Sequence, residues 1–283
     1  MVAVRGRGDA IEVLGDAETR RAFTHTALDA PAGAVFLFPG GGAQHTGMAA
    51  RLYAEDKAFR ATVEEGLAAL APEAAREIRA AWLEALVGDT KAAETLLRPS
   101  VQLPAILIIE IAVGRHLMAH GIQPQALIGH SMGENAAACL AGVFSFADAV
   151  RLVRLRGELF DTIAPGGMLS VPMDPAALKA RLPEALDLAS VNAPQFCVVS
   201  GLNEDLEAFR QSLAADGIDA TRVPIDIAAH SRMLDAILPR FEAFLRTIRL
   251  GAPRIPIVSN LSGTWLTDAE ATDPLYWLSL IHI

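Results

Sequence analysis

A serine between two glycines is the first residue in this sequence whose setting could do chemistry. The motif Gly-His-Ser-Met-Gly at 129–133 follows a short apolar run at 126–130 and precedes a helix-like stretch at 132–140. On a sharp strand-to-helix turn, small neighbours let the serine hydroxyl rise out of the sheet into a cleft. The N–H groups that open the following helix can stabilise an oxyanion. The sequence therefore predicts that Ser131 is a nucleophile that accepts an acyl group.

A serine nucleophile needs a base, and histidine is the usual one. His230 comes just before Ser231 in a segment between predicted elements, where a loop can place a base, although a lone histidine there could equally be structural. His130 adjoins the serine, but neighbouring side chains on a strand point to opposite faces, so we expect it to support the turn. His116 and His120 have a metal-ligand spacing, but no glutamate completes a zinc-protease motif, so we expect no metal site. The remaining histidines are His25, His45 and His282.

Two further segments could contact a substrate. The run Pro-Gly-Gly-Gly-Ala-Gln at 39–44 could bring backbone N–H groups close to an oxyanion or phosphate. It lacks the Gly-Lys-Ser ending of a P-loop, so nucleotide hydrolysis is not expected. Downstream, Arg151 and Arg154 lie one helical turn apart and should be solvated. Arg156 falls on another face, where it could form a core-edge ion pair or clamp a substrate carboxylate, and composition does not decide between them.

The elements that must position these residues follow an α/β order. We expect a buried strand at 34–38, helices within 50–97 and at 102–120, and a helix from Ser145 to about Phe160. A block of β-α-β-β-α-β order follows, which is typical of the ferredoxin-like pattern. Its predicted elements are 168–172, 175–182, 186–191, 196–201, 203–215 and 218–225. A helix at 233–247 and a strand at 255–259 then return to the main domain.

The predicted fold is therefore a large α/β-hydrolase-like subdomain with a small ferredoxin-like subdomain inserted into it. The large subdomain comprises 34–165 and 227–277, and the insert comprises 166–226.

Composition excludes several classes of protein. The 283 residues are 52% hydrophobic and 20% charged, which is typical of a packed globular protein. A net charge of −9 argues against a nucleic-acid partner. Cys139 and Cys197 sit in apolar runs and should be buried free thiols. No apolar run reaches about 18 residues, and the first nine residues show no apolar leader, so we expect no membrane partner and a cytoplasmic location.

Taken together, these segments resemble the acyltransferase domains of modular polyketide synthases. The similarity extends, more distantly, to the malonyl-CoA:acyl-carrier-protein transacylases of fatty acid synthesis. It covers roughly residues 34–277, and the segments that carry it are 38–44, 129–134, 141–153, 228–231 and 273–277. Several ordered motifs at family-like spacing are far more specific than any one of them.

The resemblance implies roles for individual residues. Ser131 would be acylated, and His230 would act as base and then acid, held by a backbone carbonyl instead of a third acid. Arg156, 25 residues beyond the serine, would pair with the free carboxylate of a malonyl-type substrate. The loop at 40–42 and the amide of Met132 would form the oxyanion hole, and Gln102 would line the site. We place Arg156, Gln102, Met132, Gly41 and His130 among the substrate-binding residues.

The implied reaction moves an acyl group from CoA to the phosphopantetheine thiol of an acyl carrier protein, with no bound cofactor or metal. Many members have glutamine where this chain has Gly41, and an aromatic residue where it has Asn135. Met132 and the segment Ile-Ala-Ala-His at 227–230 match neither the common malonyl nor the common methylmalonyl pattern. Both substrates stay open, with malonyl favoured.

Two other classes of function remain to be weighed. A serine esterase or lipase would need an acid between serine and histidine, and Asp205, Asp216 and Asp219 fall inside the predicted insert. A non-catalytic scaffold domain would carry an inert site.

The ends of the chain suggest a piece of a longer synthase. Residues 1–33 resemble the linker that joins a ketosynthase to an acyltransferase, which implies fused partner domains. Residues 278–283 read as a translated sequencing adapter, so we expect a non-native tail with His282 as an artefact.

Overall fold

The computed structural model describes residues 4–16, 20–23, 33–85 and 88–282, and the chain divides into two compact units at Gly33. In the first unit, residues 1–33, the helix α1 spans Arg7–Gly15. The guanidinium of Arg21 pairs with both carboxylate oxygens of Asp9, at 2.8 Å each. The sequence predicted a linker in this polar stretch, so α1 was not expected.

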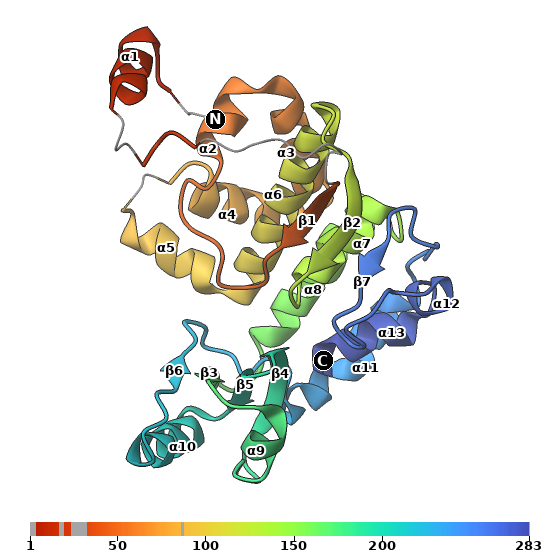
Figure 1. Cartoon of the computed structure of the whole chain (residues 1–283). Coiled ribbons are helices and arrows are strands. Elements are labelled where there is room, and N and C mark those ends of the chain that lie inside the picture. The colour runs from red at the N-terminus through yellow and green to blue at the C-terminus, as the bar shows by residue number, and fades with distance from the viewer. Residues whose placement is uncertain (1–3, 17–19, 24–32, 86–87, 283) are drawn as a thin grey trace. The chain divides into compact units, whose positions relative to one another are not determined.

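The second unit, residues 34–283, is built on a parallel three-stranded sheet in the order β1-β2-β7 (Figure 1). These strands are β1 (Ala34–Phe38), β2 (Pro124–Gly129) and β7 (Ile257–Val258). In the register, Phe38 lies opposite Gly129, and Ile128 lies opposite Val258. Because the strands are parallel, the segments that follow them emerge at one edge of the sheet, which is where α/β folds place their sites.

The prediction that β1 is a buried strand was wrong for two of its five residues. Phe36 and Phe38 are buried, but Val35 and Leu37 are 52% and 73% exposed. The apolar composition indicated a strand, whereas burial depends on what packs against each face of the sheet.

Helices pack around this sheet, and their ends follow local signals. Ser145 Oγ accepts from the N–H of Asp148 at the start of α8, and Gly142, with φ of 85°, ends α7. The helices between β1 and β3, the first strand of the second sheet, are α2 (Ala50–Glu55), α3 (Lys57–Ala68), α4 (Pro72–Trp82), α5 (Thr90–Leu97), α6 (Pro99–Ala119), α7 (Gly133–Ala141) and α8 (Phe146–Phe160).

Helix α6 is long and apolar enough, by length and composition alone, to cross a membrane. Two-thirds of its apolar window, 67%, is buried inside the protein, as expected for the central helix of a folded core. No apolar run of that length was predicted, because polar residues interrupt this one.

A second sheet forms a small subdomain with its own apolar core (Figure 1). Its four strands are antiparallel and lie in the order β4-β5-β3-β6. Its elements are β3 (Gly167–Val171), α9 (Pro175–Lys179), β4 (Asp187–Ala193), β5 (Phe196–Gly201), α10 (Asn203–Ala215) and β6 (Thr221–Arg222). The order of helices and strands is the predicted one, but β6 is much shorter than the strand expected at 218–225.

The chain then returns to the large subdomain. The helix expected at 233–247 is divided into a 3₁₀ segment, η1 (Arg232–Ile237), and α11 (Leu238–Leu245), in which Pro239 stands at the second position. After β7 come α12 (Asp268–Ala271), α13 (Pro274–Ser279) and η2 (Leu280–His282). Trp277 of α13 is buried and packs edge-on against Phe144.

Cys139 and Cys197 are buried and free, which confirms the prediction for both thiols.

Candidate active site

Ser131 stands on a tight turn between β2 and α7, in the left-handed backbone conformation with φ of 54°. The two flanking glycines are required by close approach of the backbone. A Cβ at Gly129 would lie 2.0 Å from the N of Glu134, and one at Gly133 would lie 2.3 Å from the carbonyl oxygen of Phe38. The Gly-x-Ser-x-Gly spacing therefore has the physical cause expected from the sequence, a turn too tight for a side chain at either glycine position.

His230 meets this serine from a distant part of the chain. Its Nε2 lies 2.8 Å from Ser131 Oγ, and its Nδ1 lies 3.0 Å from the carbonyl oxygen of Ile281. A carbonyl can only accept, so Nδ1 carries the proton, and Nε2 is left to accept the hydrogen bond of the serine hydroxyl. Ile281 belongs to the stretch interpreted as a non-native tail. Because the acceptor is a backbone carbonyl, the side chain at position 281 does not orient the imidazole.

The environment keeps His230 neutral. Burial lowers the pKa of His230 from 6.5 to about 3, and the nearby cation of Arg156 acts in the same direction. A neutral imidazole with a free Nε2 lone pair is the form that can remove a proton from Ser131.

Arg156 points into the same cavity and is only 3% exposed. Its guanidinium carbon lies 5.3 Å from the ring centroid of Phe160, one turn further along α8. Within the described ranges, its Nε has no hydrogen-bond partner. No carboxylate pairs with it among the residues that the structure describes. Burial lowers the pKa of Arg156 to about 10, so the side chain is still cationic at neutral pH. Of the two roles that the sequence left open, the core-edge ion pair is therefore not formed within the described residues, and the clamp is the role that is left.

The cavity that holds these side chains has a volume of about 250 Å³. Gly41, Gln102 and Met132 line it together with Ser131 and His230, as expected from the sequence. A Cβ at Gly41 would lie 3.0 Å from Gln102 Oε1, so this loop and α6 are in close contact. The N–H groups of Gly133 and Glu134 bond back to the carbonyls of His130 and Ser131, whereas that of Met132 makes no such turn bond within the described part of the chain.

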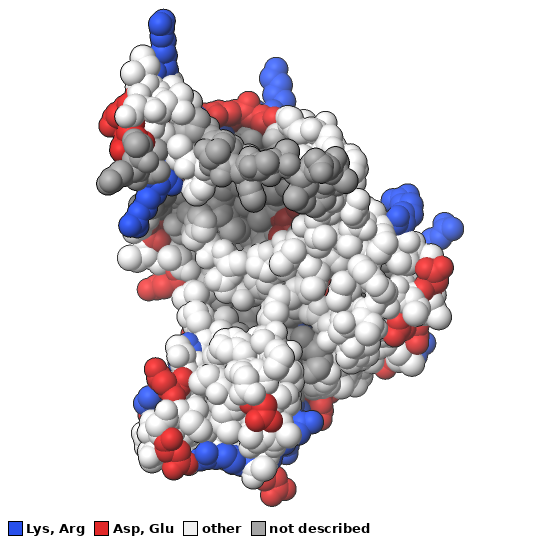
Figure 2. All heavy atoms as spheres, in the orientation of Figure 1, with Lys and Arg blue, Asp and Glu red and all other residues white. Residues whose placement is uncertain are grey.

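The small subdomain supplies the opposite, apolar wall of the cavity. Its contributing side chains include Met168, Val198, Val223 and Ile225. Figure 2 shows that charged side chains gather at the edges of this face of the molecule, and that the surface between them is largely uncharged. A buried cation without a carboxylate partner, in a cavity with one apolar wall, is a site for one anionic group.

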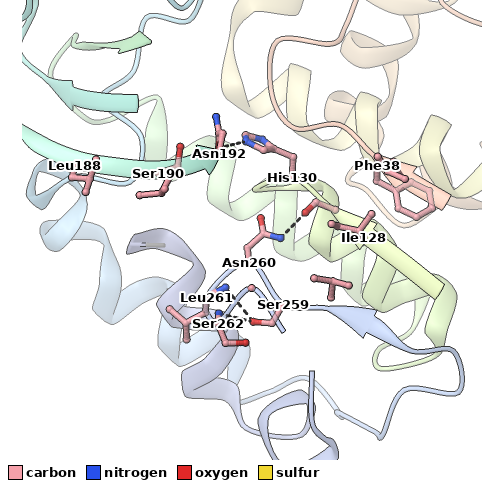
Figure 3. Close-up of a pocket in the computed structure, with 15 residues that line it drawn as sticks. Phe38, Ile128, His130, Leu188, Ser190, Asn192, Ser259, Asn260, Leu261 and Ser262 are labelled. Atoms are coloured by element: carbon pink, nitrogen blue, oxygen red, sulfur yellow. Dashed lines mark hydrogen bonds between the residues drawn. The ribbon is translucent and has the colours of Figure 1, made fainter. Parts of the chain in front are cut away.

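His130 joins the two subdomains at the rim of the cavity. Its Nε2 lies 3.2 Å from Asn192 Oδ1 on β4 (Figure 3). The backbone around it is closely packed, since a Cβ at Gly40 would lie 2.8 Å from the carbonyl oxygen of His130. The backbone of His130 is thus part of the turn, whereas its side chain lines the cavity and bonds to the small subdomain.

A wider groove of about 690 Å³ adjoins the cavity and shares His130, Ser190 and Asn192 with it (Figure 3). Asn260, which follows β7, lies on this groove. Its Oδ1 accepts from the N–H of Ser131 at 2.7 Å, and its Nδ2 donates to the carbonyl of Gly129 at 2.5 Å.

Asn260 and two residues that support it were not predicted from the sequence. Glu134 accepts from the N–H of Asn260 at 2.9 Å, and the hydroxyl of Tyr276 donates to its other oxygen. Burial raises the pKa of Glu134 to about 7. Signals for these residues existed, because Glu134 and Tyr276 lie within two of the family-like segments and Asn260 directly follows a predicted strand.

Other predicted candidates lie away from this site. The ring of His116 on α6 lies 4.4 Å from that of His120, with its Nδ1 3.8 Å from Asp56. In the described part of the chain, no cluster of histidine, cysteine, aspartate and glutamate could hold a metal ion. Asp205, Asp216 and Asp219 are not among the hydrogen-bond partners of His230. His25 lies outside the described residues.

Comparison with known proteins places this chain in a family. Residues 35–279 match the acyl transferase domain family, so the chain belongs to it. A relative from Mycobacterium tuberculosis, one of its phenolphthiocerol/phthiocerol polyketide synthases, is 36% identical over 243 residues, which are 86% of this chain and 16% of the relative. The chain therefore spans a small part of that relative's length.

Two solved structures are also similar. The acyl transferase domain of ZmaA superposes with a TM-score of 0.87 at 34% identity, over 97% of this chain and 64% of the other. The acyl transferase domain of SpnD, in complex with 2-(pent-4-yn-1-yl)malonyl, gives a TM-score of 0.84 at 36% identity with the same coverage. This protein is thus an acyltransferase domain of the type found in polyketide synthases.

Proposed function

We propose that this domain transfers a malonyl-type acyl group from CoA to the phosphopantetheine thiol of an acyl carrier protein, through an ester on Ser131. The observation that carries the proposal is the unpaired, buried guanidinium of Arg156 in the same cavity as the Ser131–His230 pair. An acyl group that ends in a carboxylate would supply the missing partner.

In the first step, Ser131 Oγ attacks the thioester carbonyl while its proton passes to His230 Nε2. The oxyanion that forms is stabilised by the N–H of Met132 and by backbone N–H groups of the loop at 40–42. The carbon–sulfur bond then breaks, and the proton on His230 passes to the departing thiolate, which leaves as free CoA. In the second step the thiol of the carrier gives its proton to His230 and attacks the ester, and Ser131 recovers its proton.

The substrate carboxylate would also change the base. Arg156 is one of the causes that hold the pKa of His230 low. A bound carboxylate offsets this positive charge and makes protonation of His230 easier at the moment when the imidazole must accept the serine proton. Acyl groups without a carboxylate lose both the clamp and this effect.

The choice between malonyl and methylmalonyl depends on the apolar wall. Ile227, Ala229 and Met132 line the cavity with the side chains of β3 and β5. Such a wall would accommodate an α-alkyl group, and the solved SpnD domain holds an alkynyl-substituted malonyl group. We keep malonyl as the expected substrate and methylmalonyl as its direct competitor.

The domain assignments are part of this proposal. We infer that residues 166–226 are a ferredoxin-like insert, supported by the β-α-β-β-α-β order and by the antiparallel sheet order β4-β5-β3-β6. A ketosynthase-to-acyltransferase linker at 1–33, fused synthase domains, a non-native tail at 278–283 and a cytoplasmic location stay predictions.

Intact-mass measurement after incubation with equal malonyl-CoA and methylmalonyl-CoA tests the function. We expect one covalent acyl adduct, absent in Ser131→Ala, that disappears when a carrier protein with its phosphopantetheine arm is added. A persistent adduct in Ser131→Ala would move the nucleophile elsewhere.

Two further assays separate the two rival functions from acyl transfer. Hydrolysis of a p-nitrophenyl ester faster than transfer to the carrier would favour an esterase, although His230 has a carbonyl partner where that class has a carboxylate. Failure of a fluorophosphonate to label Ser131 would favour an inert scaffold.

A further inference from the structure

The side-chain amide of Asn260 bonds to the backbone of the nucleophile itself and to that of Gly129, two residues before it. Figure 3 shows the bond to Gly129. Its oxygen accepts from the N–H of Ser131, and its nitrogen donates to the carbonyl of Gly129. Both hydrogen-bonding functions of the amide are thus used on one turn. Ser131 needs such support because a left-handed conformation is strained for any residue with a side chain, and surrounding contacts must hold it.

Asn260 is itself held in place from two other elements. Its N–H donates to Glu134, which is completely buried on the first turn of α7. The hydroxyl of Tyr276, on α13, donates to the second oxygen of Glu134 and lies 2.7 Å from Ser259 Oγ. A hydrogen-bonded chain thus runs from Tyr276 through Glu134 and Asn260 to the backbone of Ser131.

The same C-terminal segment also holds the base. Tyr276 lies on α13, and the carbonyl that accepts from His230 Nδ1 belongs to Ile281 on η2, which directly follows α13. Both partners of the 2.8 Å hydrogen bond between Ser131 and His230 are therefore oriented from residues 274–282.

We propose that Asn260 is a positioning residue for the Ser131 nucleophile, and that Glu134 and Tyr276 act through it. The inference rests on Ser131 being the acylated residue. None of the three residues lines the catalytic cavity, so they act on the position of the hydroxyl and not on the substrate. A misplacement of about 1 Å between reacting groups can cost about 100-fold in rate.

The test measures two reactions of Ser131 in single-turnover experiments on the full chain: acylation by malonyl-CoA and phosphonylation by a fluorophosphonate. Asn260→Ala should slow both by about 100-fold per folded molecule, with an unchanged half-saturating concentration of malonyl-CoA. Tyr276→Phe, which keeps the ring, should slow both by about fivefold. The double variant should be no slower than Asn260→Ala, because Tyr276 acts only through Asn260. Ser262→Ala, on the same loop without a bond to the turn, should react like the wild type.

Equal phosphonylation rates in Asn260→Ala and wild type would overturn the inference. A loss of rate in Asn260→Ala that is fully explained by a smaller folded fraction, measured by thermal unfolding, would also overturn it. The same holds if the rate losses of Asn260→Ala and Tyr276→Phe multiply in the double variant. If Asn260→Ala does not fold, two other variants test the inference. Asn260→Asp replaces the donor to Gly129 with a carboxylate oxygen. A wild-type phosphonylation rate in both Asn260→Asp and Tyr276→Phe would overturn the inference. The fluorophosphonate needs no malonyl group, so an absence of malonyl labelling with fast phosphonylation would count against the proposed substrate and leave the positioning test intact.

Discussion

Replacing Arg156 with alanine should separate the activity of this protein from its stability. The guanidinium is buried without a carboxylate partner in the described chain, so a substrate carboxylate would form its ion pair. Removing one partner of a buried pair costs about 3 to 5 kcal/mol. At about 1.36 kcal/mol for each factor of ten, kcat/KM for malonyl-CoA should fall by about 150- to 5,000-fold. The rate with acetyl-CoA, which has no carboxylate, should not fall.

The stability of the same variant follows from the free protein. Burial lowers the pKa of Arg156 from 12.5 to about 10, so holding the cation inside costs on the order of 3 kcal/mol at neutral pH. Its removal relieves that cost but loses the packing of the side chain and its contact with the ring of Phe160, which together are worth a similar amount. We therefore expect the free energy of unfolding to stay within about 1 kcal/mol of the wild type.

The assay compares single-turnover acylation by malonyl-CoA and acetyl-CoA with urea unfolding of the same samples. Arg151→Ala, on the exposed face of the same helix, is the matched control. It should change neither the ratio of malonyl to acetyl acylation rates nor the free energy of unfolding. An unchanged malonyl-to-acetyl ratio in Arg156→Ala would refute the clamp. A loss of stability large enough to account for the loss of activity would refute the claim that Arg156 acts on activity and not on stability.

Two further predictions concern buried titratable groups. Burial and Arg156 lower the pKa of His230 to about 3, so the unfolded state binds a proton that the folded state excludes. The resulting stability is complete above pH 6.5 and is lost as the pH falls toward 3. In urea unfolding, His230→Gln should therefore lose less stability than the wild type between pH 6.5 and 4.5, and an equal loss would contradict the assignment. The carboxyl oxygens of Glu110 have no hydrogen-bond partner among the described residues, and burial raises the pKa of Glu110 well above 4.5. The folded state therefore favours the protonated form, and stability declines as the pH rises above 4.5. Glu110→Gln should thus unfold at higher urea than the wild type at pH 8 and at about the same urea at pH 4.5, and equal midpoints at pH 8 would count against this.

Much of the local structure could be predicted because its causes lie within a few residues. The strand at 34–38 and the helix at 203–215 have the predicted bounds. Apolar runs bounded by glycine and proline, and helical periodicity with caps, depend on neighbours in the chain. The burial of β1 could not be predicted in this way, since Val35 and Leu37 are exposed for reasons that lie in other elements.

The same distinction between local and distant causes separates the site residues that were predicted from those that were not. The residues that belong to a motif, Ser131 with its flanking glycines, were found because steric demands of a turn act on adjacent residues. His230 and Arg156 were candidates whose roles the residues alone left open, and the resemblance supplied them. Asn260 was missed because an asparagine after a strand has no distinctive neighbour, and its partners are 129 and 131 positions away.

The sequence by itself therefore determined that a serine stands on a strand-to-helix turn, since glycine spacing and apolar runs are sufficient for that geometry. Only the tertiary structure decided that His230 Nε2 stands 2.8 Å from the hydroxyl, that a backbone carbonyl orients the imidazole, and that Arg156 has no internal partner in the described chain. The reason is physical: distance, burial and the absence of a counter-charge depend on segments far apart in the chain, brought together at one edge of a parallel sheet.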